Sequence, residues 1–186
     1  MRACGRCGGV AIKPSRLDEY RYELMGIPVI LVNAAWQFVC DDCAHEVTLI
    51  PDQEGLTAAV AVARVHVPIK LNGKEIRFLR KALGFTAATL GDGIGTSAET
   101  ISRWERDHAP ISPKSEIILR VLVAASLSDN APAIDVNLPA IISMTINPIR
   151  NGFDSAPMRF ERVKLKENRK KRELWDTTVA PAEEAA

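Results

Sequence analysis

The sequence predicts an α+β protein with a small β-rich N-terminal module, an all-α domain in the middle and an irregular C-terminal extension. Three observations lead to this fold class. Two C-x2-C pairs stand 32 residues apart near the N-terminus, with alternating apolar and polar residues between them. Four helix-capping signals follow at short intervals within residues 71–127, and four prolines interrupt residues 128–158. The predicted divisions are therefore residues 1–67, 68–127 and 128–186.

Composition excludes several classes of protein. Hydrophobic residues make up 47% of the chain and charged residues 25%, which is ordinary for a globular protein. The longest apolar stretch, Ile27 to Trp36, contains Pro28 and Asn33 and is far shorter than the ~18 residues that a membrane helix needs. The N-terminal MRACGRCGG lacks the apolar core of a secretory signal. We therefore expect a cytoplasmic protein with no membrane contact.

The four cysteines are Cys4, Cys7, Cys40 and Cys43. Thiols stay reduced in the cytosol, where two C-x2-C pairs predict a tetrahedral, structural Zn2+ site. Redox-active or nucleophilic cysteines are the alternative, although no neighbouring base singles one out. His45 is either a substitute ligand or a surface histidine.

Alternation between the cysteine pairs predicts a small antiparallel sheet of about three strands, which zinc stabilises. Asp52 caps a predicted helix that runs to about Val65 and links this module to the next. The dipeptide Val67–Pro68 ends that helix, because a residue before proline avoids the α region. The expected strands lie at residues 20–24, 27–32 and 36–40.

Residues 71–127 predict four short helices with clear capping signals. Asn72 and Glu75 form a capping box, and Gly84 ends the first helix. The remaining caps are Thr86, Ser97 and Ser112.

The second and third of these helices are joined by the short turn Gly95-Thr96-Ser97, which predicts a helix-turn-helix. Gly91 and Gly93 inside the second helix cost up to ~1 kcal/mol each relative to alanine. They either weaken that helix or allow it to pack closely on the third. The stretch GDGIG lacks the strand and lysine of a phosphate-binding loop.

The run KEIRFLRKALGFT, followed by SAETISRWER, resembles the DNA-binding domain of phage repressors, Cro proteins and Xre-type regulators. One departure is Ala87, where these domains usually carry a glutamine that contacts the DNA backbone. Together with the cysteine module, which is similar to the YgiT-type zinc finger, residues 1–127 resemble the MqsA-type antitoxin family. The resemblance implies a structural zinc, a toxin or other protein bound by residues 1–67, and a domain that dimerises and represses its own operon.

In this motif the third helix enters the major groove of double-stranded DNA. Ile101 and Trp104 face the core, and Arg103 can donate to guanine O6 and N7. The resemblance places Arg103 at a base-contacting position of the family. At a second base-contacting position, where the family usually carries an asparagine, this sequence has Glu99. The predicted base-contacting residues are Ala98, Glu99, Ser102 and Arg103, and the predicted phosphate-contacting residues are Lys70, Lys74, Thr86, Arg106 and Lys114.

The fourth helix is apolar almost all round, with Arg120 as the main exception, so both its sides must be covered. The second side packs either on another copy, as in a homodimer, or on the C-terminal extension. The predicted dimerisation residues are Ile118, Leu119, Leu122 and Val123.

The C-terminal extension is predicted to be partly ordered. We expect a packing segment within Val136 to Ile149, a strand over Phe160, Val163 and Leu165, a short basic helix from Asn168 to Trp175, and a disordered VAPAEEAA terminus. Residues 159–173 carry a net charge of +5 and form a basic block. That block is either a contact for nucleic acid or an acidic partner, or a solvated charged segment.

These features predict a sequence-specific DNA-binding repressor that binds a palindromic operator as a homodimer, in the manner of an antitoxin that regulates its own gene. The alternative is a protein-interaction adaptor whose zinc module grips a partner and whose helix-turn-helix mainly dimerises. An enzyme is disfavoured, because the three histidines His45, His66 and His108 form no visible nucleophile–base pair.

Overall fold

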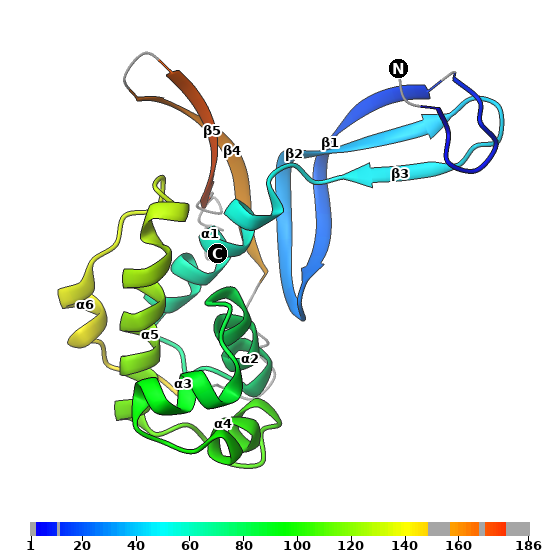
Figure 1. The fold of residues 1–186 in the computed structure, drawn as a ribbon. Coiled ribbons are helices and arrows are strands. Elements are labelled where there is room, and N and C mark those ends of the chain that lie inside the picture. The colour runs from blue at the N-terminus through cyan, green and yellow to red at the C-terminus, as the bar shows by residue number, and fades with distance from the viewer. Residues whose placement is uncertain (1–2, 11, 149–156, 168–169, 178–186) are drawn as a thin grey trace, which may run out of the picture.

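The computed structural model describes residues 3–10, 12–148, 157–167 and 170–177, and it confirms the predicted α+β class. A helical body carries a long β-ribbon that projects away from it, and a second hairpin lies beside the inner half of that ribbon (Figure 1). The elements are β1 (Ile12–Leu24), β2 (Ile27–Cys40), β3 (Glu46–Leu49), α1 (Gln53–His66), α2 (Gly73–Ala82), α3 (Ala87–Ile94), α4 (Ala98–Glu105), α5 (Pro113–Leu127), a 3-10 helix at Ser128–Asn130, α6 (Leu138–Ile142), β4 (Met158–Glu167) and β5 (Lys170–Thr177).

β2 is the central strand of the sheet. β1 pairs with it in antiparallel fashion, from Leu24 opposite Ile27 to Ile12 opposite Cys40. The other edge of β2 is shared, because β4 runs parallel to residues 29–32 and β3 runs antiparallel to residues 36–39.

A bulge divides the β1–β2 ribbon into two halves. The register shifts between Leu17 and Glu19, and opposite them Asn33 has a φ of 48°, a left-handed conformation that asparagine tolerates better than most residues. We call the outer half, residues 12–17 and 35–49, the arm. The prediction of two separate strands at residues 27–32 and 36–40 was wrong, because β2 is one strand that continues through the bulge. Strand β3 was not predicted.

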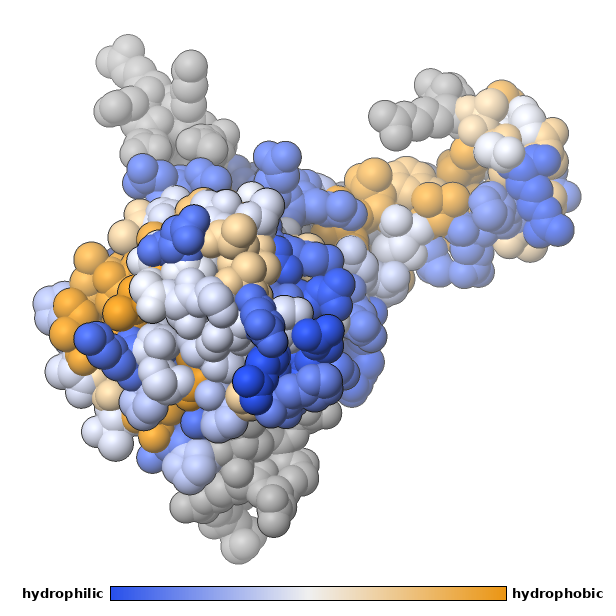
Figure 2. All heavy atoms as spheres, turned by 60° about the horizontal axis from the view of Figure 1, so that its bottom comes forward, coloured by the Kyte–Doolittle hydropathy of each residue, from blue (hydrophilic) through white to orange (hydrophobic). Residues whose placement is uncertain are grey.

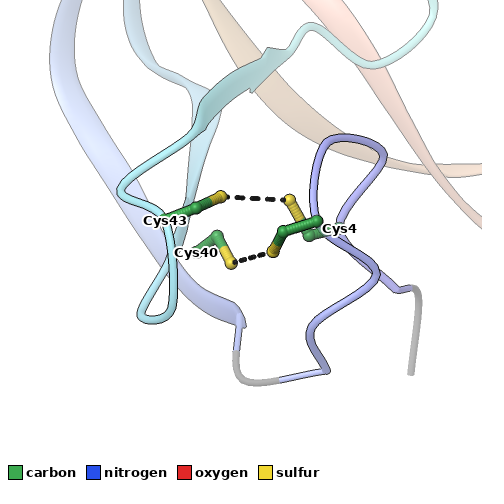
Figure 3. Close-up of side chains that lie close together, drawn as sticks. Cys4, Cys40 and Cys43 are labelled. Atoms are coloured by element: carbon green, nitrogen blue, oxygen red, sulfur yellow. Dashed lines mark hydrogen bonds between the residues drawn. The ribbon is translucent and has the colours of Figure 1, made fainter.

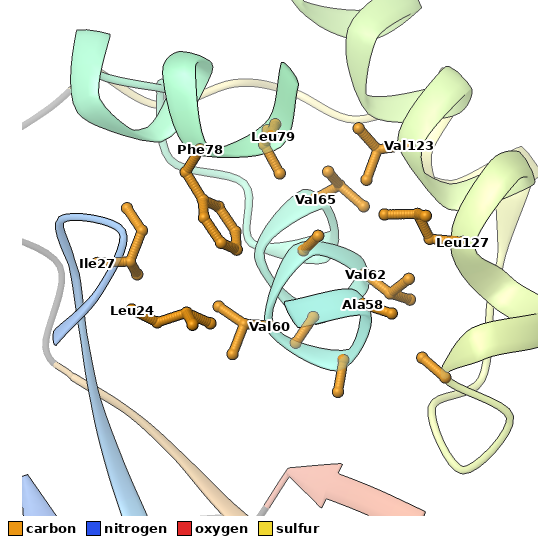
Figure 4. Packing of buried hydrophobic residues seen from close by; sticks show 14 of the residues in the cluster. Leu24, Ile27, Ala58, Val60, Val62, Val65, Phe78, Leu79, Val123 and Leu127 are labelled. Carbon is orange, nitrogen blue, oxygen red and sulfur yellow. The ribbon is translucent and has the colours of Figure 1, made fainter. Parts of the chain in front are cut away.

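α1 lies at the centre of the hydrophobic core. Its predicted N-cap is confirmed, since the Asp52 side chain accepts from the Gly55 N–H at 3.0 Å. Apolar side chains cover the helix all round, so it must be buried on every side. Figure 4 shows it between Leu24 and Ile27 of the ribbon, Phe78 of α2 and the side chains of α5.

Two buried ion pairs fix the connection from α1 to α2. Arg64 pairs with Glu75 and Arg120 pairs with Glu116, and all four side chains are at most 3% exposed. The two guanidinium groups donate to the backbone carbonyls of Val65, Val67, Ile69 and Lys70, while the Leu71 N–H donates to Glu116. Burial lowers the pKa of Arg120, and the Glu116 carboxylate opposes that shift. The connection is therefore held by charged hydrogen bonds from side chains that are almost completely buried.

The four predicted helices of residues 71–127 are confirmed as α2 to α5. The capping box is complete: Asn72 accepts from the Glu75 N–H, and Glu75 accepts from the Asn72 N–H, both at 2.9 Å. Thr86, Ser97 and Ser112 cap α3, α4 and α5.

The C-terminal extension joins the body and the sheet. α6 buries Ile141 beneath α5, and β4 confirms the predicted strand over Phe160, Val163 and Leu165. The predicted helix from Asn168 to Trp175 was wrong: Lys170–Thr177 is strand β5, because pairing with β4 overrides the modest helix preference of lysine. Ile149 and the VAPAEEAA terminus lie outside the described residues.

Candidate metal centre and helix-turn-helix surface

The four cysteines lie on two turns at the tip of the arm (Figure 3). In the first turn Cys4 donates its N–H to the Gly9 carbonyl, and Gly8 donates to the Cys4 carbonyl. The second turn repeats this pattern, with Cys40 donating to the His45 carbonyl and Ala44 donating to the Cys40 carbonyl. Both turns need a left-handed residue after the second cysteine, which Gly8 supplies at φ 76° and Ala44 at φ 54°.

The sulfur positions fit a tetrahedral metal site. The Cys4 and Cys43 sulfurs are 3.7 Å apart, the Cys7 and Cys40 sulfurs are 3.6 Å apart, and all four lie within 4.8 Å of one another. A tetrahedron with Zn–S bonds of ~2.3 Å has edges of roughly 3.8 Å. A disulfide would need sulfurs ~2.05 Å apart, and all four thiols are free.

The chemistry of the four thiols also favours a cation. Backbone N–H groups of Cys7 and Arg6 lower the pKa of Cys4 to about 6. The Gly9 N–H acts to lower the pKa of Cys7, but the side chains of Cys43 and Cys40 outweigh it and raise that pKa to about 12. Four thiolates this close repel one another, so full ionisation needs a positive charge between them. A metal ion held by the four sulfurs would supply that charge, and the four-cysteine geometry is consistent with a structural Zn2+.

His45 has a backbone role in this cluster. Its carbonyl accepts from the Cys40 N–H at 3.0 Å, which closes the second turn. Among the described residues the cluster of potential ligands consists of the four cysteines.

The helix-turn-helix consists of α3, a turn at residues 95–97 and α4 (Figure 1). Gly95 ends α3 at φ 73°, and the Thr96 N–H donates to the Gly91 carbonyl at 2.8 Å. A Cβ at Gly91 would lie 2.7 Å from the Thr96 carbonyl oxygen, whereas a Cβ at Gly93 would meet nothing within 4 Å. Gly91 therefore allows the close approach of α3 to the turn, and Gly93 does not contribute to it.

α2 fixes the C-terminal end of α4. A Cβ at Gly73 would lie 2.7 Å from the carbonyl oxygens of Trp104 and Glu105, and the Gly73 N–H donates to Asp107 at 2.6 Å. Arg80 of α2 also pairs with Glu105 through two hydrogen bonds. These contacts could not be predicted from the sequence, because nothing in the local pattern reveals which residues of α2 meet α4.

Residues on α4 divide into two faces as predicted. Ile101 has no exposed area and Trp104 is 6% exposed, so both lie in the core. Arg103 and Glu99 are exposed, and within the described residues the Arg103 guanidinium has no hydrogen-bond or ion-pair partner. Ala98 is exposed as well and Ser102 is half-buried. Figure 2 looks toward this end of the molecule, where much of the surface is hydrophilic.

The predicted phosphate-contacting residues differ in their surroundings. Thr86 caps α3 with its hydroxyl, which accepts from the Thr89 N–H at 3.1 Å. Lys70 is half-buried and lines a cavity of about 260 Å³ between α5 and residues 144–148. The other three, Lys74, Arg106 and Lys114, are exposed.

The predicted dimerisation residues on α5 are only partly available. Leu119 and Val123 have no exposed area because they lie in the chain's own core. The prediction that these two residues contact a second copy was therefore wrong. Ile118 and Leu122, one helical turn apart, remain half-buried. On the adjacent α6, Ile142 is 61% exposed.

The arm carries a further apolar surface, which was not predicted from the sequence. Trp36 pairs with Leu49 and Phe38 with Val47 across the β2–β3 ladder, so the four residues share one face. Trp36, Leu49 and Val47 are 39%, 43% and 51% exposed. Hydrophobic atoms line the arm in Figure 2. We call Trp36, Phe38, Val47 and Leu49 the arm patch.

A comparison with protein families identifies the middle of the chain. The helix-turn-helix family model HTH_3 matches residues 76–121, from α2 into α5. No curated protein matches the chain. The family match and the four-cysteine cluster fit the predicted type of protein, and the helix-turn-helix supports a DNA-binding transcription regulator. This is a class that is typically not enzymatic. Among the described helices none combines the length and apolar character needed to cross a membrane.

Proposed function

We propose that this protein is a zinc-containing, homodimeric repressor that binds a palindromic operator and regulates its own gene in the manner of an antitoxin. The observation that carries the proposal is the outer face of α4. Its Arg103 guanidinium is exposed and has no partner among the described residues, while Ile101 and Trp104 anchor the opposite face in the core.

Base recognition follows from the residues on that face. With α4 in the major groove, Arg103 donates two hydrogen bonds to guanine O6 and N7, a contact that discriminates by ~1–3 kcal/mol. Glu99 accepts from cytosine N4, and Ala98 contacts a thymine methyl group. Ser102 completes the surface that touches the bases.

Phosphate contacts orient α4 without reading the sequence. Thr86 is the N-cap of α3, where backbone N–H groups and the helix dipole favour an anion. Lys74, Arg106 and Lys114 add positive charge, and Lys70 takes part only if it leaves its half-buried position.

Zinc has a structural role in this proposal. Cys4, Cys7, Cys40 and Cys43 fill all four tetrahedral positions, so no position is open for a substrate. The metal joins the two cysteine turns and thereby stabilises the arm and its tip, where Cys4, Ala35 and Cys40 are the buried residues among those described.

Dimerisation is proposed to use Ile118 and Leu122 of α5, continued by Ile142 of α6. Figure 2 shows hydrophobic atoms on the side of the body where α5 and α6 lie. A twofold contact there would place two α4 helices on half-sites about 34 Å apart.

The antitoxin part of the proposal rests on the resemblance of residues 1–127 and on the arm patch. An exposed apolar surface on a projecting arm is typical of a site for a protein partner. If the protein were only an adaptor, a partner would still bind the arm patch, but DNA would not be read.

The test is binding of the purified protein to the DNA upstream of its own gene, compared with a shuffled duplex of equal length at physiological salt. We expect a preference of ~10³-fold or more, with a footprint of two half-sites. Arg103→Ala should reduce that preference, whereas Arg21→Ala, which removes an exposed arginine from β1, should not. A wild-type protein without preference for its upstream DNA would contradict autoregulation and favour the adaptor.

A further inference from the structure

The cavity of about 260 Å³ beside Lys70 lies between the first turns of α5 and residues 144–148. Its apolar wall comes from Ile117 on α5 and from Met144 and Ile146 on the segment after α6. Glu116 and Lys70 add one acidic and one basic residue to the lining. An apolar cavity of ~150 Å³ can hold benzene, so this cavity has room for a somewhat larger molecule.

Hydrogen bonds hold the walls of the cavity in place. The Lys70 N–H donates to the Asn147 carbonyl at 2.8 Å, and the Asn147 N–H donates to the Pro68 carbonyl at 2.9 Å. The sulfur of Met144 accepts from Arg120, whose guanidinium is fully buried. The walls are therefore joined to the connection after α1 and to the core.

The Glu116 carboxylate has one oxygen with several donors and one oxygen without any. Its Oε1 accepts from the Leu71 N–H at 3.0 Å and from Nη2 and Nε of Arg120 at 2.8 and 3.3 Å. Its Oε2 accepts from no group in the described part of the chain, although the side chain is only 1% exposed. Among the described residues, Arg162 Nε is the one buried side-chain nitrogen or oxygen that lacks both a hydrogen bond and solvent contact. Oε2 therefore keeps some contact with solvent, on the cavity that Glu116 lines.

The Lys70 ammonium is the second polar group of the cavity. Lys70 is half-buried, and within the described ranges its ammonium has no ion pair or hydrogen bond. Glu116 does not compensate this charge, because its carboxylate is already paired with Arg120 at 2.8 Å. The lining therefore combines an apolar wall with one uncompensated positive charge and one acceptor oxygen that can take a further donor.

We propose that this cavity binds a small apolar carboxylic acid that carries a hydroxyl group, such as a branched-chain or aromatic hydroxy acid. The carboxylate of the ligand accepts from the Lys70 ammonium, and its hydroxyl donates to Glu116 Oε2. Its hydrocarbon body packs on Ile117, Met144 and Ile146. A monoanion matches the single uncompensated charge. The hydroxyl is needed because a ligand that displaced solvent without donating to Oε2 would leave a buried acceptor unsatisfied, which is costly.

Binding of such an acid does not depend on DNA, but its consequence for regulation rests on the proposed function. Lys70 is one of the predicted phosphate-contacting residues, and a carboxylate bound to its ammonium would keep it in the cavity. The acid should therefore lower operator affinity. Loss of one phosphate contact should also reduce the slope of log K against log salt by about 1 unit.

The probes are leucic acid, which is the hydroxy-acid analogue of leucine, and mandelic acid, which has the same polar groups on an aromatic body. Each is titrated by calorimetry into the full-length protein at millimolar concentration, without DNA, and thermal unfolding gives a second readout. We expect at least one of them to bind and to raise Tm. Isocaproic acid lacks the hydroxyl of leucic acid and isoamyl alcohol lacks its carboxylate, so each should bind roughly tenfold or more weakly.

The test variant is Lys70→Met, which removes the ammonium and keeps the apolar stem. It should weaken binding of leucic acid roughly tenfold or more and leave isoamyl alcohol unchanged, because the alcohol has no carboxylate. The matched control Lys81→Met removes an exposed lysine from α2 and should change neither. Ile117→Trp, which fills the cavity, should weaken every probe, and thermal unfolding shows whether each variant is folded.

Any of four results would overturn the proposal: no binding of either hydroxy acid, an equal loss in Lys70→Met and Lys81→Met, unchanged binding by a folded Ile117→Trp, or tighter binding of leucine than of leucic acid. The last result would identify a zwitterion as the ligand. Because these titrations contain no DNA, failure of the proposed operator binding leaves them unaffected. The effect of leucic acid on operator affinity is a separate measurement.

Discussion

Substitution of Gly91 by alanine tests the packing of the helix-turn-helix most sharply. Helix propensity alone predicts that alanine inside α3 stabilises the protein by up to ~1 kcal/mol. The structure predicts the opposite, because the new Cβ would lie 2.7 Å from the Thr96 carbonyl oxygen and 3.2 Å from the Ser97 carbonyl carbon. Both contacts are with backbone atoms, which cannot rotate away as a side chain can.

The expected magnitude follows from these two opposing effects. Overpacking costs ~1–3 kcal/mol, which exceeds the propensity gain in most of that range. We therefore expect Gly91→Ala to be destabilising by up to ~2 kcal/mol. A protein of this size loses about 2–4 °C in Tm per kcal/mol. The turn must also shift, so operator affinity should fall together with stability.

Gly93→Ala is the matched control, since it lies two residues away in the same helix and its new Cβ would have nothing within 4 Å. We expect it to stabilise the protein by ~0.5–1 kcal/mol and to leave DNA binding unchanged. Denaturant unfolding of both variants measures the difference. If Gly91→Ala stabilised the protein as much as Gly93→Ala, the close approach of α3 to the turn would be refuted.

The remaining predictions concern the core, the metal and the hairpin. Arg120→Met should lower the free energy of unfolding by ~3–5 kcal/mol in a urea titration, because Glu116 is left as a buried charge without its partner; an equal loss in Glu116→Gln with Arg120→Met would speak against this cause. Cobalt substitution should give the thiolate-to-metal absorption of a tetrahedral site at one metal per chain, and Cys40→Ser should weaken it, while two cobalt ions per chain would exclude a single four-cysteine site. Trp175→Phe should cost ~1 kcal/mol in thermal unfolding, through loss of its hydrogen bond to the Asp52 carbonyl; an unchanged Tm would show that this bond contributes nothing.

Local signals explain why α2 to α5 could be predicted from the sequence. A cap such as Ser97 acts on the N–H of Thr100, three residues away, so the sequence contains the whole interaction. The cysteine site was predictable for a related reason, since each C-x2-C pair forms one turn. The two glycines of α3 show the limit of local reasoning: both cost helix propensity, and only the fold shows that Gly91 is needed.

Long-range contacts explain what the sequence did not reveal. The ion pair of Arg64 with Glu75 and the hydrogen bonds from Arg120 to the connection after α1 depend on how α1 packs between α2 and α5. Strand β5 was predicted as a helix because its local residue preferences favour a helix. Its pairing with β4, a contact between distant parts of the hairpin, outweighs those preferences. The arm patch was missed because β3, which carries Val47 and Leu49, is only four residues long and forms against β2.

The claim that α4 reads DNA through Arg103 is tested most directly by selection of binding sites from a random pool of duplexes. Wild-type protein should enrich a palindrome whose half-sites are centred about one helical turn apart. Arg103→Ala should enrich the same palindrome with one guanine position relaxed in each half-site, since loss of one bidentate contact costs ~1–3 kcal/mol at that base pair. Enrichment of no sequence by the wild-type protein, or of an unchanged sequence by Arg103→Ala, would contradict the account.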